Sequence, residues 1–429
     1  MADEGPEAAT DPGPDVPVTR RTLLAGALGA ATAAFARSLA AQMPANPVQG
    51  SPAPQSPAAD PTHMQGHPTS AVGTRAPSVH LARAPVGAVV GESYTPLQDL
   101  DGTITPADLH FERHHAGVPT IDPVGYRLLI HGLVDRPVVF TLADLRRFPA
   151  CSRICFLECS GNGRKGYRAM SPQTTPQQID GLTSTSEWTG VALATLLAEA
   201  GIQKSARWLL AEGGDAALLT RSIPVAKALD DALVAYAQNG EPLRPEQGFP
   251  VRLVLPGWEG NMNVKWLRRI KVGDEPFMTR EETARYTDAL RGDEARQFSF
   301  VMDAKSIITF PAYPTVLPDR GWCEVRGIAW SGRGRVAAVD VSADGGATWA
   351  PATLQHPVLP MAHTRFRYLW QWQGQPATLM SRATDETGYV QPTLATLRSV
   401  RGPGTNYHLN NIRGWDVDAA GRVTFAARV

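Results

Sequence analysis

The spacing of apolar residues changes near residue 300, and this change constrains the fold more than any other feature of the sequence. From there to the C-terminus, short apolar runs alternate with turn residues. The run at 335–342 leads into Asp344-Gly345-Gly346, and Asp-Gly-Gly between two strand-like runs is a strong hairpin signal. Runs of similar spacing follow at 364–372, 377–384 and 393–400. The pattern predicts a small antiparallel sandwich of immunoglobulin type over residues 296–429.

Residues 91–295 show a mixed pattern. Apolar runs at 126–132 and 251–256 are bounded by Gly and Pro and predict strands. Between them, 141–148 predicts a short helix capped by its first threonine, and 193–200 predicts one that ends before a glycine. Strands and helices without a strict βαβ alternation predict an α+β domain. A chain of 429 residues is long enough for two such folded domains.

The N-terminus has the pattern of an export signal. Arg20 and Arg21 precede a short apolar stretch at 23–35, and small residues follow. A charged region, a short apolar region and a small-residue end predict a signal peptide over 1–41, and the paired arginines favour the twin-arginine route to the periplasm. A general secretory signal with chance arginines is the alternative. Residues 42–90, rich in Pro, Ser and Ala, predict a linker.

Composition excludes some classes of protein. The chain carries 41 basic and 41 acidic residues, without the basic stripe that a nucleic-acid partner requires. After the signal, no apolar run approaches the roughly 20 residues that span a bilayer, so we expect no membrane segment there. The chain has four cysteines, too few for a disulfide framework in an exported protein of this size.

The segment 153–164 is the most informative part of the chain. An apolar strand runs into a Gly-Asn-Gly turn, and Cys159 sits where strand becomes loop. Arg164 follows closely, and a nearby guanidinium lowers a thiol pKa and favours the thiolate that transition metals bind. Cysteines in such a position are more often small core residues. From the residues alone, both interpretations stay open.

Two further clusters carry cations. Residues 111–115 (Phe-Glu-Arg-His-His) form a loop that suits an anion or a polar heterocycle, although these residues taken alone favour a solvated loop. Arg252 lies inside an apolar strand, which is costly unless it meets an anion such as phosphate, and Lys265 is a candidate second cation. An arginine that extends from a sheet edge to solvent is the alternative.

The three clusters, in this order and spacing, resemble the molybdopterin-binding domain of the sulfite oxidase family. The sandwich, with Ala-Trp-Ser-Gly at 329–332 and Val-Ser-Ala-Asp-Gly-Gly at 341–346, resembles that family's dimerisation domain. The similarity runs from about residue 95 to the C-terminus. Within the family, the strings at 181–190 and 256–266 look most similar to the molybdenum subunits of bacterial sulfane (sulfite) dehydrogenases. The resemblance implies an α+β molybdopterin-binding domain followed by an all-β immunoglobulin-like sandwich.

The resemblance also implies roles for particular residues. Cys159 falls on the cysteine that ligates molybdenum. The catalytic positions implied are Arg113, Cys159, Arg164 and Tyr286. The cofactor-binding positions implied are Phe111, Arg113, His115, Cys159, Asp215, Gln247, Arg252, Asn263, Val264 and Lys265. Two departures matter. Gln247 stands where animal sulfite oxidases carry histidine, and the loop 165–179 is longer than theirs and has no clear counterpart of their substrate lysine.

The implied activity is oxidation of reduced sulfur by a molybdenum–molybdopterin cofactor, with one molybdenum per chain. The implied substrate is sulfane sulfur on a carrier protein, or sulfite, in thiosulfate oxidation. No C-x-x-C-H haem motif occurs in the chain, so we expect no haem here and a c-type cytochrome subunit as electron acceptor. A homodimer or heterotetramer is expected. The alternatives are a free-sulfite dehydrogenase with a diffusible cytochrome acceptor, and a cofactor-free binding module.

Overall fold

The computed structural model describes residues 65–66, 68–168, 171–290, 294–402 and 404–427. The predicted signal peptide at 1–41 lies outside the described residues, as does most of the predicted linker. From Arg75 on, the described residues form one structural unit. Within these residues, no helix combines the length and the apolar character needed to cross a bilayer.

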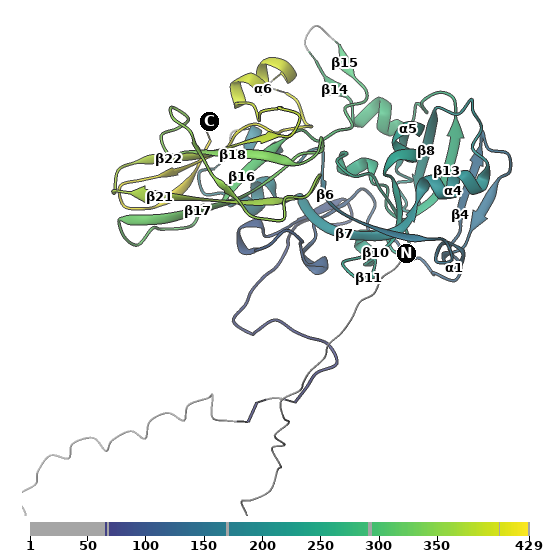
Figure 1. Cartoon of the computed structure of the whole chain (residues 1–429), viewed down its shortest axis with the longest axis horizontal. Coiled ribbons are helices and arrows are strands. Elements are labelled where there is room, and N and C mark those ends of the chain that lie inside the picture. Colours follow the sequence, from purple (N-terminus) through teal and green to yellow (C-terminus); the bar gives the residue numbers. More distant parts are fainter. Residues whose placement is uncertain (1–64, 67, 169–170, 291–293, 403, 428–429) are drawn as a thin grey trace, which may run out of the picture. The chain divides into compact units, whose positions relative to one another are not determined.

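An α+β domain comes first along the chain (Figure 1). Its strands are β1 (Ala84–Gly87), β2 (Gly91–Tyr94), β3 (Glu112–His114), β4 (Leu128–Gly132), β5 (Val138–Phe140), β6 (Ala150–Glu158), β7 (Thr183–Ala192), β8 (Trp208–Gly213), β9 (Thr220–Pro224), β10 (Leu233–Gln238), β11 (Glu241–Pro242), β12 (Arg252–Val254), β13 (Leu267–Gly273), β14 (Asp288–Ala289) and β15 (Ala295–Arg296). Its α-helices are α1 (Leu142–Leu145), α2 (Arg164–Tyr167), α3 (Pro176–Asp180), α4 (Leu193–Ala200) and α5 (Val225–Asp230). Its 3₁₀ helices are η2 (Leu97–Asp99), η3 (Ala107–Leu109), η4 (Pro245–Gln247) and η5 (Gly260–Met262), and η6 (Glu281–Arg285) is a π-helix.

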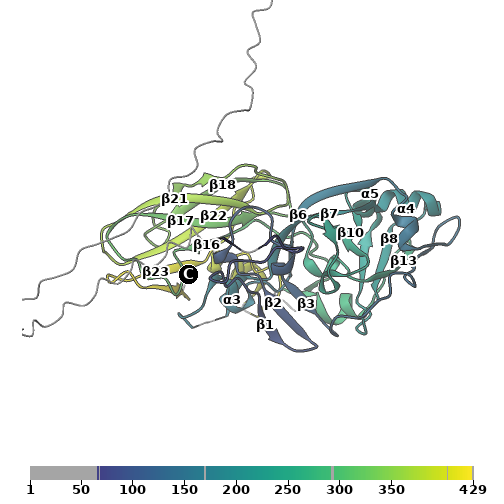
Figure 2. The ribbon, with the colours of Figure 1, turned by 90° about the horizontal axis from the view of Figure 1, so that it is seen from below.

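Three sheets organise this domain, and β14 and β15 form a further two-stranded sheet. One has the order β11-β10-β7-β6, with β12 pairing β10, and a second has the order β5-β4-β13-β8-β9, in which β4 and β13 are parallel. A large apolar core fills the space around these sheets and α4. The small sheet β1-β2-β3 lies beside α3 (Figure 2). β1 falls within the range predicted as linker.

The second domain is a sandwich of two antiparallel sheets. Its elements are β16 (Lys305–Phe310), β17 (Gly321–Trp330), β18 (Val336–Ser342), β19 (Ala350–Pro351), β20 (Thr353–Leu354), β21 (Thr364–Trp372), β22 (Ala377–Asp385), α6 (Leu394–Arg401), β23 (Gly414–Val417) and β24 (Val423–Ala426). One sheet has the order β16-β17-β21-β20 and the other β19-β18-β22-β23-β24. An apolar cluster with Phe366, Trp370 and Trp415 packs within the sandwich. The predicted fold class is confirmed.

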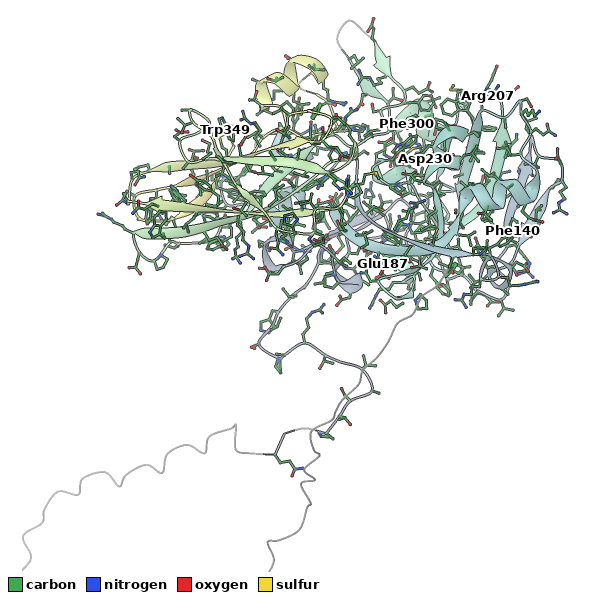
Figure 3. The ribbon with its side chains drawn as sticks, in the orientation of Figure 1. Phe140, Glu187, Arg207, Asp230, Phe300 and Trp349 are labelled. Atoms are coloured by element: carbon green, nitrogen blue, oxygen red, sulfur yellow. The ribbon has the colours of Figure 1, made fainter. Side chains whose placement is uncertain are left out.

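Local signals explain several elements. Thr141 and Asp144 form the capping box that begins α1, and α4 ends at Gly201, whose φ is +71°. The Asp-Gly-Gly hairpin joins β18 to β19, and Trp349 (Figure 3) fastens it by donating to the Gly346 carbonyl at 3.1 Å. These predictions are confirmed.

The strand predicted at 393–400 is wrong, because these residues form α6. Thr393 caps the helix by accepting from the Thr396 N–H at 3.1 Å. Leu394 and Leu397 are buried, and their spacing of three residues is helical. The β-branched residues of this run favoured a strand, but the cap and the buried leucines outweigh them.

Candidate active site

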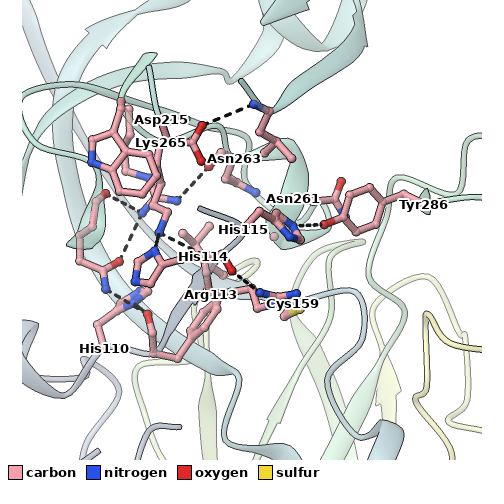
Figure 4. A pocket seen from close by; sticks show the side chains of 17 residues that line it. His110, Arg113, His114, His115, Cys159, Asp215, Asn261, Asn263, Lys265 and Tyr286 are labelled. Atoms are coloured by element: carbon pink, nitrogen blue, oxygen red, sulfur yellow. Dashed lines mark hydrogen bonds between the residues drawn. The ribbon is translucent and has the colours of Figure 1, made fainter. Parts of the chain in front are cut away.

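A pocket lies where β6 ends, beside the residues around β3 and the segment from η4 to β13 (Figure 4). We call it the inner pocket. The predicted residues that line it are Phe111, Arg113, His115, Cys159, Asp215, Gln247, Arg252, Asn263, Lys265 and Tyr286. The Val264 side chain does not line it, because it is fully buried in the apolar core. Segments far apart in sequence thus converge on one pocket.

Cys159 follows directly after β6. Its N–H donates to the Leu182 carbonyl at 3.0 Å, and its carbonyl accepts from the Asn162 N–H at 2.8 Å. Burial raises the pKa of its thiol, and the Gly161 N–H together with the charges of Arg113 and Arg164 offsets this only in part. The predicted lowering of the thiol pKa is therefore wrong for the protein without a metal, since desolvation outweighs the arginines. Metal binding would displace the proton.

The side chain of Glu158, the residue before Cys159, is held in place by residues of the sandwich domain. The Lys305 ammonium lies 3.0 Å from its Oε1, and the Trp330 indole N–H donates to its Oε2 at 2.7 Å. Within the loop, the Asn162 amide also donates to Oε1, at 3.0 Å. All these side chains are buried. The second domain thus fixes the place at which the first presents its thiol.

Arg252 is a buried cation in the inner pocket. Its Nη1 donates to the Gln247 carbonyl at 3.0 Å and its Nη2 to the Asn263 carbonyl at 3.1 Å. Its Nε has no hydrogen-bond partner among the described residues. Burial lowers the pKa of the guanidinium to about 9. Because no acidic side chain pairs with it in the described part of the chain, the site is suited to an incoming anion.

Lys265 lies next to Arg252 on the pocket wall. Its ammonium donates to the Arg113 carbonyl at 3.1 Å and to the Glu246 carbonyl at 3.0 Å, and its Nζ lies 2.8 Å from His114 Nδ1. Burial lowers its pKa well below the ordinary value, and the charge of Arg252 acts in the same direction. Lys265 therefore holds the β3 residues in place, and an anion bound in the pocket would favour the charged form of its amine.

Two pocket residues that sequence reasoning missed are His110 and Asn261. Both line the inner pocket, and the buried atoms His110 Nε2 and Asn261 Oδ1 have no hydrogen-bond partner among the described residues. Burial lowers the pKa of His110 to about 3, so its ring is neutral at neutral pH. The pocket thus offers unpartnered polar atoms, the neighbouring basic side chains Arg252 and Lys265, and the Cys159 thiol. Together these groups fit a polar heterocycle that carries an anionic group and presents a metal to Cys159.

A second pocket, which we call the outer pocket, shares Arg113, His115, Cys159 and Tyr286 with the inner one. Arg164 lines it, donating from Nη2 to the Asn406 carbonyl at 3.2 Å. The residues of this pocket that sequence reasoning did not assign are Glu92, Ser160, Gly161, Leu182, Arg285 and Tyr407. Three guanidinium groups around one thiol suit an anionic substrate.

Tyr286 follows the π-helix η6, a type of element frequent at functional sites. Its hydroxyl lies 2.8 Å from His115 Nε2, and Arg285 Nη1 lies 3.1 Å from His115 Nδ1. Burial, followed by the charge of Arg113, lowers the pKa of His115 to about 4, so the ring is neutral at neutral pH. A guanidinium only donates, so Nδ1 accepts and Nε2 carries the proton. Tyr286 accepts that proton's hydrogen bond, and its own O–H is free to donate into the pocket.

The fold and the two pockets define a molybdopterin oxidoreductase. The family model "Oxidoreductase molybdopterin binding domain" matches residues 115–281, and the model "Mo-co oxidoreductase dimerisation domain" matches residues 296–414. The chain therefore belongs to the sulfite oxidase family of molybdopterin oxidoreductases.

Individual relatives agree with this assignment. The chain is 34% identical over 333 residues to mitochondrial sulfite oxidase of Mus musculus, covering 71% of this chain and 60% of that protein. It is 34% identical over 333 residues to a nitrate reductase [NADH] of Solanum lycopersicum, with 68% of this chain and 36% of that protein covered. The chain thus spans about a third to three fifths of these relatives' lengths.

A solved structure gives a longer match. The sulfane dehydrogenase SoxCD from Paracoccus pantotrophus has a chain that is 42% identical and superposes with a TM-score of 0.79. The match covers 85% of this chain and 98% of that one. Both domains of the chain, and not only one of them, therefore share this architecture.

Proposed function

We propose that this chain catalyses the molybdenum-dependent oxidation of reduced sulfur, either sulfane sulfur bound to a carrier protein or sulfite. The observation that carries the proposal is that the single thiol of Cys159 borders both pockets, one suited to an anionic heterocycle and one lined by arginines. Similarity to the sulfane dehydrogenase supports the carrier-bound substrate. The arginines of the outer pocket also suit free sulfite, and a free-sulfite dehydrogenase is the second candidate.

The residues of the inner pocket would hold the cofactor in this scheme. Arg252 and Lys265 would face its anionic group, His110 and Asn261 would meet the edge of its heterocycle, and Cys159 would ligate its metal. The chemistry that the cofactor supplies when bound is oxygen-atom transfer to sulfur coupled to acceptance of an electron pair.

The residues of the outer pocket would hold the substrate. Arg113 and Arg164 orient an anionic sulfur group and stabilise negative charge on its oxygens. Burial raises the pKa of the Tyr286 phenol above its ordinary value, so the hydroxyl stays protonated and donates a hydrogen bond to a substrate oxygen. In the balanced reaction the sulfur gains an oxygen atom that originates in water, an electron pair leaves to the acceptor and the water's protons go to bulk solvent.

The proposal also covers the compartment, the electron acceptor and the oligomeric state of the enzyme. Export through the twin-arginine route would place it in the periplasm, where a c-type cytochrome accepts the electrons during thiosulfate oxidation. The match to a dimerisation-domain model supports a homodimer or a heterotetramer with that cytochrome.

The test is a metal and activity assay on the exported protein. We expect about one molybdenum and one pterin per chain and sulfur-dependent reduction of a c-type cytochrome. Rates with free sulfite and with a persulfide on a carrier protein separate the two substrates. Folded protein without molybdenum would favour the cofactor-free binding module.

Cys159→Ser tests the metal ligand. We expect oxidation activity to fall by at least about a thousandfold, with an unchanged circular dichroism spectrum. Cys151→Ser is the matched control, because Cys151 lies on β6, the strand that leads into Cys159, and lines neither pocket. Full activity in Cys159→Ser would refute the assignment.

A further inference from the structure

The outer pocket contains one carboxylate among its three arginines. Glu92 lies on β2, directly across from Arg113 on β3, and its side chain is 25% exposed. It lines the outer pocket together with Cys159. Its negative charge also acts to raise the pKa of the Cys159 thiol. A negative charge close to the reacting position opposes the binding of an anionic substrate. The question is therefore what Glu92 contributes to this pocket.

Glu92 is not needed to hold Arg113 in place. The nearest approach of the pair is 4.0 Å, from Arg113 Nε to Glu92 Oε2, which is too long for a hydrogen bond. Arg113 Nη1 donates instead to the Gly91 and His114 carbonyls, the first at 3.2 Å. Two backbone carbonyls thus already orient the guanidinium.

The carboxylate has its own support. The Tyr94 hydroxyl donates to Glu92 Oε1, and the Lys165 ammonium lies 4.6 Å from the centre of the Tyr94 ring. Lys165 lies on α2, directly after Arg164, which lines the same pocket. Tyr94 therefore fixes Glu92 in the wall of the outer pocket independently of Arg113.

We propose that Glu92 determines which anions the outer pocket accepts, weakening the binding of dianions such as free sulfite in favour of a singly charged sulfane end, such as a persulfide. This inference rests on the proposed function and names its substrate class. A dianion is repelled by Glu92 twice as strongly as a monoanion in the same position. The arginines still attract both, so the carboxylate discriminates by charge without closing the pocket.

The test is calorimetric titration of the cofactor-loaded full chain with sulfate as the dianion and methanesulfonate as the monoanion. In Glu92→Gln we expect sulfate to bind about tenfold more tightly and methanesulfonate about threefold, since the repulsion scales with the charge of the ligand. Glu92→Asp keeps the charge and should stay within about twofold of the wild type.

The matched control is Glu324→Gln, which removes the same charge from a Glu–Arg pair between β17 and β21 that lines neither pocket. It should leave both titrations unchanged. In steady-state assays of Glu92→Gln, the KM for sulfite should fall with the sulfate Kd.

Unchanged or weaker sulfate binding in Glu92→Gln would overturn the inference, as would equal gains for the two anions. The titration does not depend on turnover. If the wild type oxidises neither sulfite nor a persulfide but sulfate binding responds as expected, the proposed function fails and the charge selection stands. If oxidation occurs without this response, only the charge selection fails.

Discussion

Lys305 is a buried cation between the two domains, and its replacement tests how the sandwich supports the Cys159 loop. Its side chain is 1% exposed, and its ammonium lies 3.0 Å from Glu158 Oε1 and 2.8 Å from Asp180 Oδ1. Lys305→Met keeps most of the volume and removes the charge. Two buried carboxylates then lose their shared partner.

The expected loss of unfolding free energy depends on which hydrogen-bond and ion-pair partners Glu158 and Asp180 retain in the variant. Removing one partner of a buried ion pair costs about 3–5 kcal/mol. Asp180 retains Arg413, whose Nε lies 2.8 Å from Asp180 Oδ2, and Glu158 retains the hydrogen bonds from Trp330 and Asn162. We therefore expect a loss near the lower end of that range, about 3 kcal/mol of unfolding free energy at neutral pH.

The loss should depend on pH in a defined direction. Burial acts to raise the pKa of Asp180, but the charges of Arg413 and Lys305 outweigh it and hold the pKa below its ordinary value. A carboxyl whose pKa is lower in the folded state stabilises the fold above its unfolded pKa of about 3.9, and loses that contribution as the pH falls through the folded pKa. In Lys305→Met the pKa of Asp180 in the folded state is higher than in the wild type. As the pH falls, Asp180 is therefore protonated in the variant before it is in the wild type, and the variant then no longer carries the cost of its unpaired charge. The difference between variant and wild type should therefore shrink below about pH 5.

Urea unfolding followed by circular dichroism at pH 7.5 and at pH 4.5 measures both effects. Arg367→Met is the control, because it breaks an exposed pair with Glu324 at 2.9 Å and should cost less than about 1 kcal/mol. A loss below about 1 kcal/mol at pH 7.5, or an equal loss at both pH values, would refute the reasoning.

Two further predictions concern the cofactor site and the loop. Arg252→Gln should lower the pterin content of the purified protein by at least about tenfold, because the inner pocket loses its unpaired cation. Quantitative pterin fluorescence measures this, and retention at the level of the exposed Arg268→Gln control would contradict it. Gly163→Ala should cost about 2–4 kcal/mol in urea unfolding, because φ is +81° and the new Cβ would lie 2.1 Å from Arg413 Nη2. Gly240→Ala has the same φ with nothing within 4 Å, and it should lose only about 1 kcal/mol; equal losses in the two variants would exclude the contact with Arg413 as the cause.

Local signals in the sequence were sufficient to predict much of the fold. The capping box at Thr141 and the hairpin at Asp344–Gly346 depend on residues a few positions apart, so they can be recognised without a structure. The prediction that Cys159, Arg252 and Lys265 belong to one site came from the resemblance to a family and not from the spacing of these residues. The three line a single pocket because β6, β12 and β13 converge there.

The rest of the site depends on contacts that no local pattern indicates. Glu92 and Arg285 reach the outer pocket from elements 193 positions apart in the chain numbering, and neither stands in an unusual sequence context. The same limit applies to the thiol of Cys159. A nearby Arg164 predicts a lowered pKa, but the depth of burial decides the outcome, and burial is a property of the whole fold.

The sandwich domain contributes to the candidate active site. The loop that follows Cys159 is held from the far end of the chain, because His408 donates its N–H to the Ser160 carbonyl at 2.8 Å. Arg413 donates to the Gly163 carbonyl at 3.2 Å, and the Asn406 carbonyl accepts from Arg164. The loop is also held within the first domain, because the Leu182 N–H donates to Asn162 Oδ1 at 3.0 Å and the Asn261 amide donates to the Ser160 hydroxyl at 3.1 Å. Both domains therefore position the proposed metal ligand, and Tyr407 of the C-terminal segment lines the outer pocket beside it.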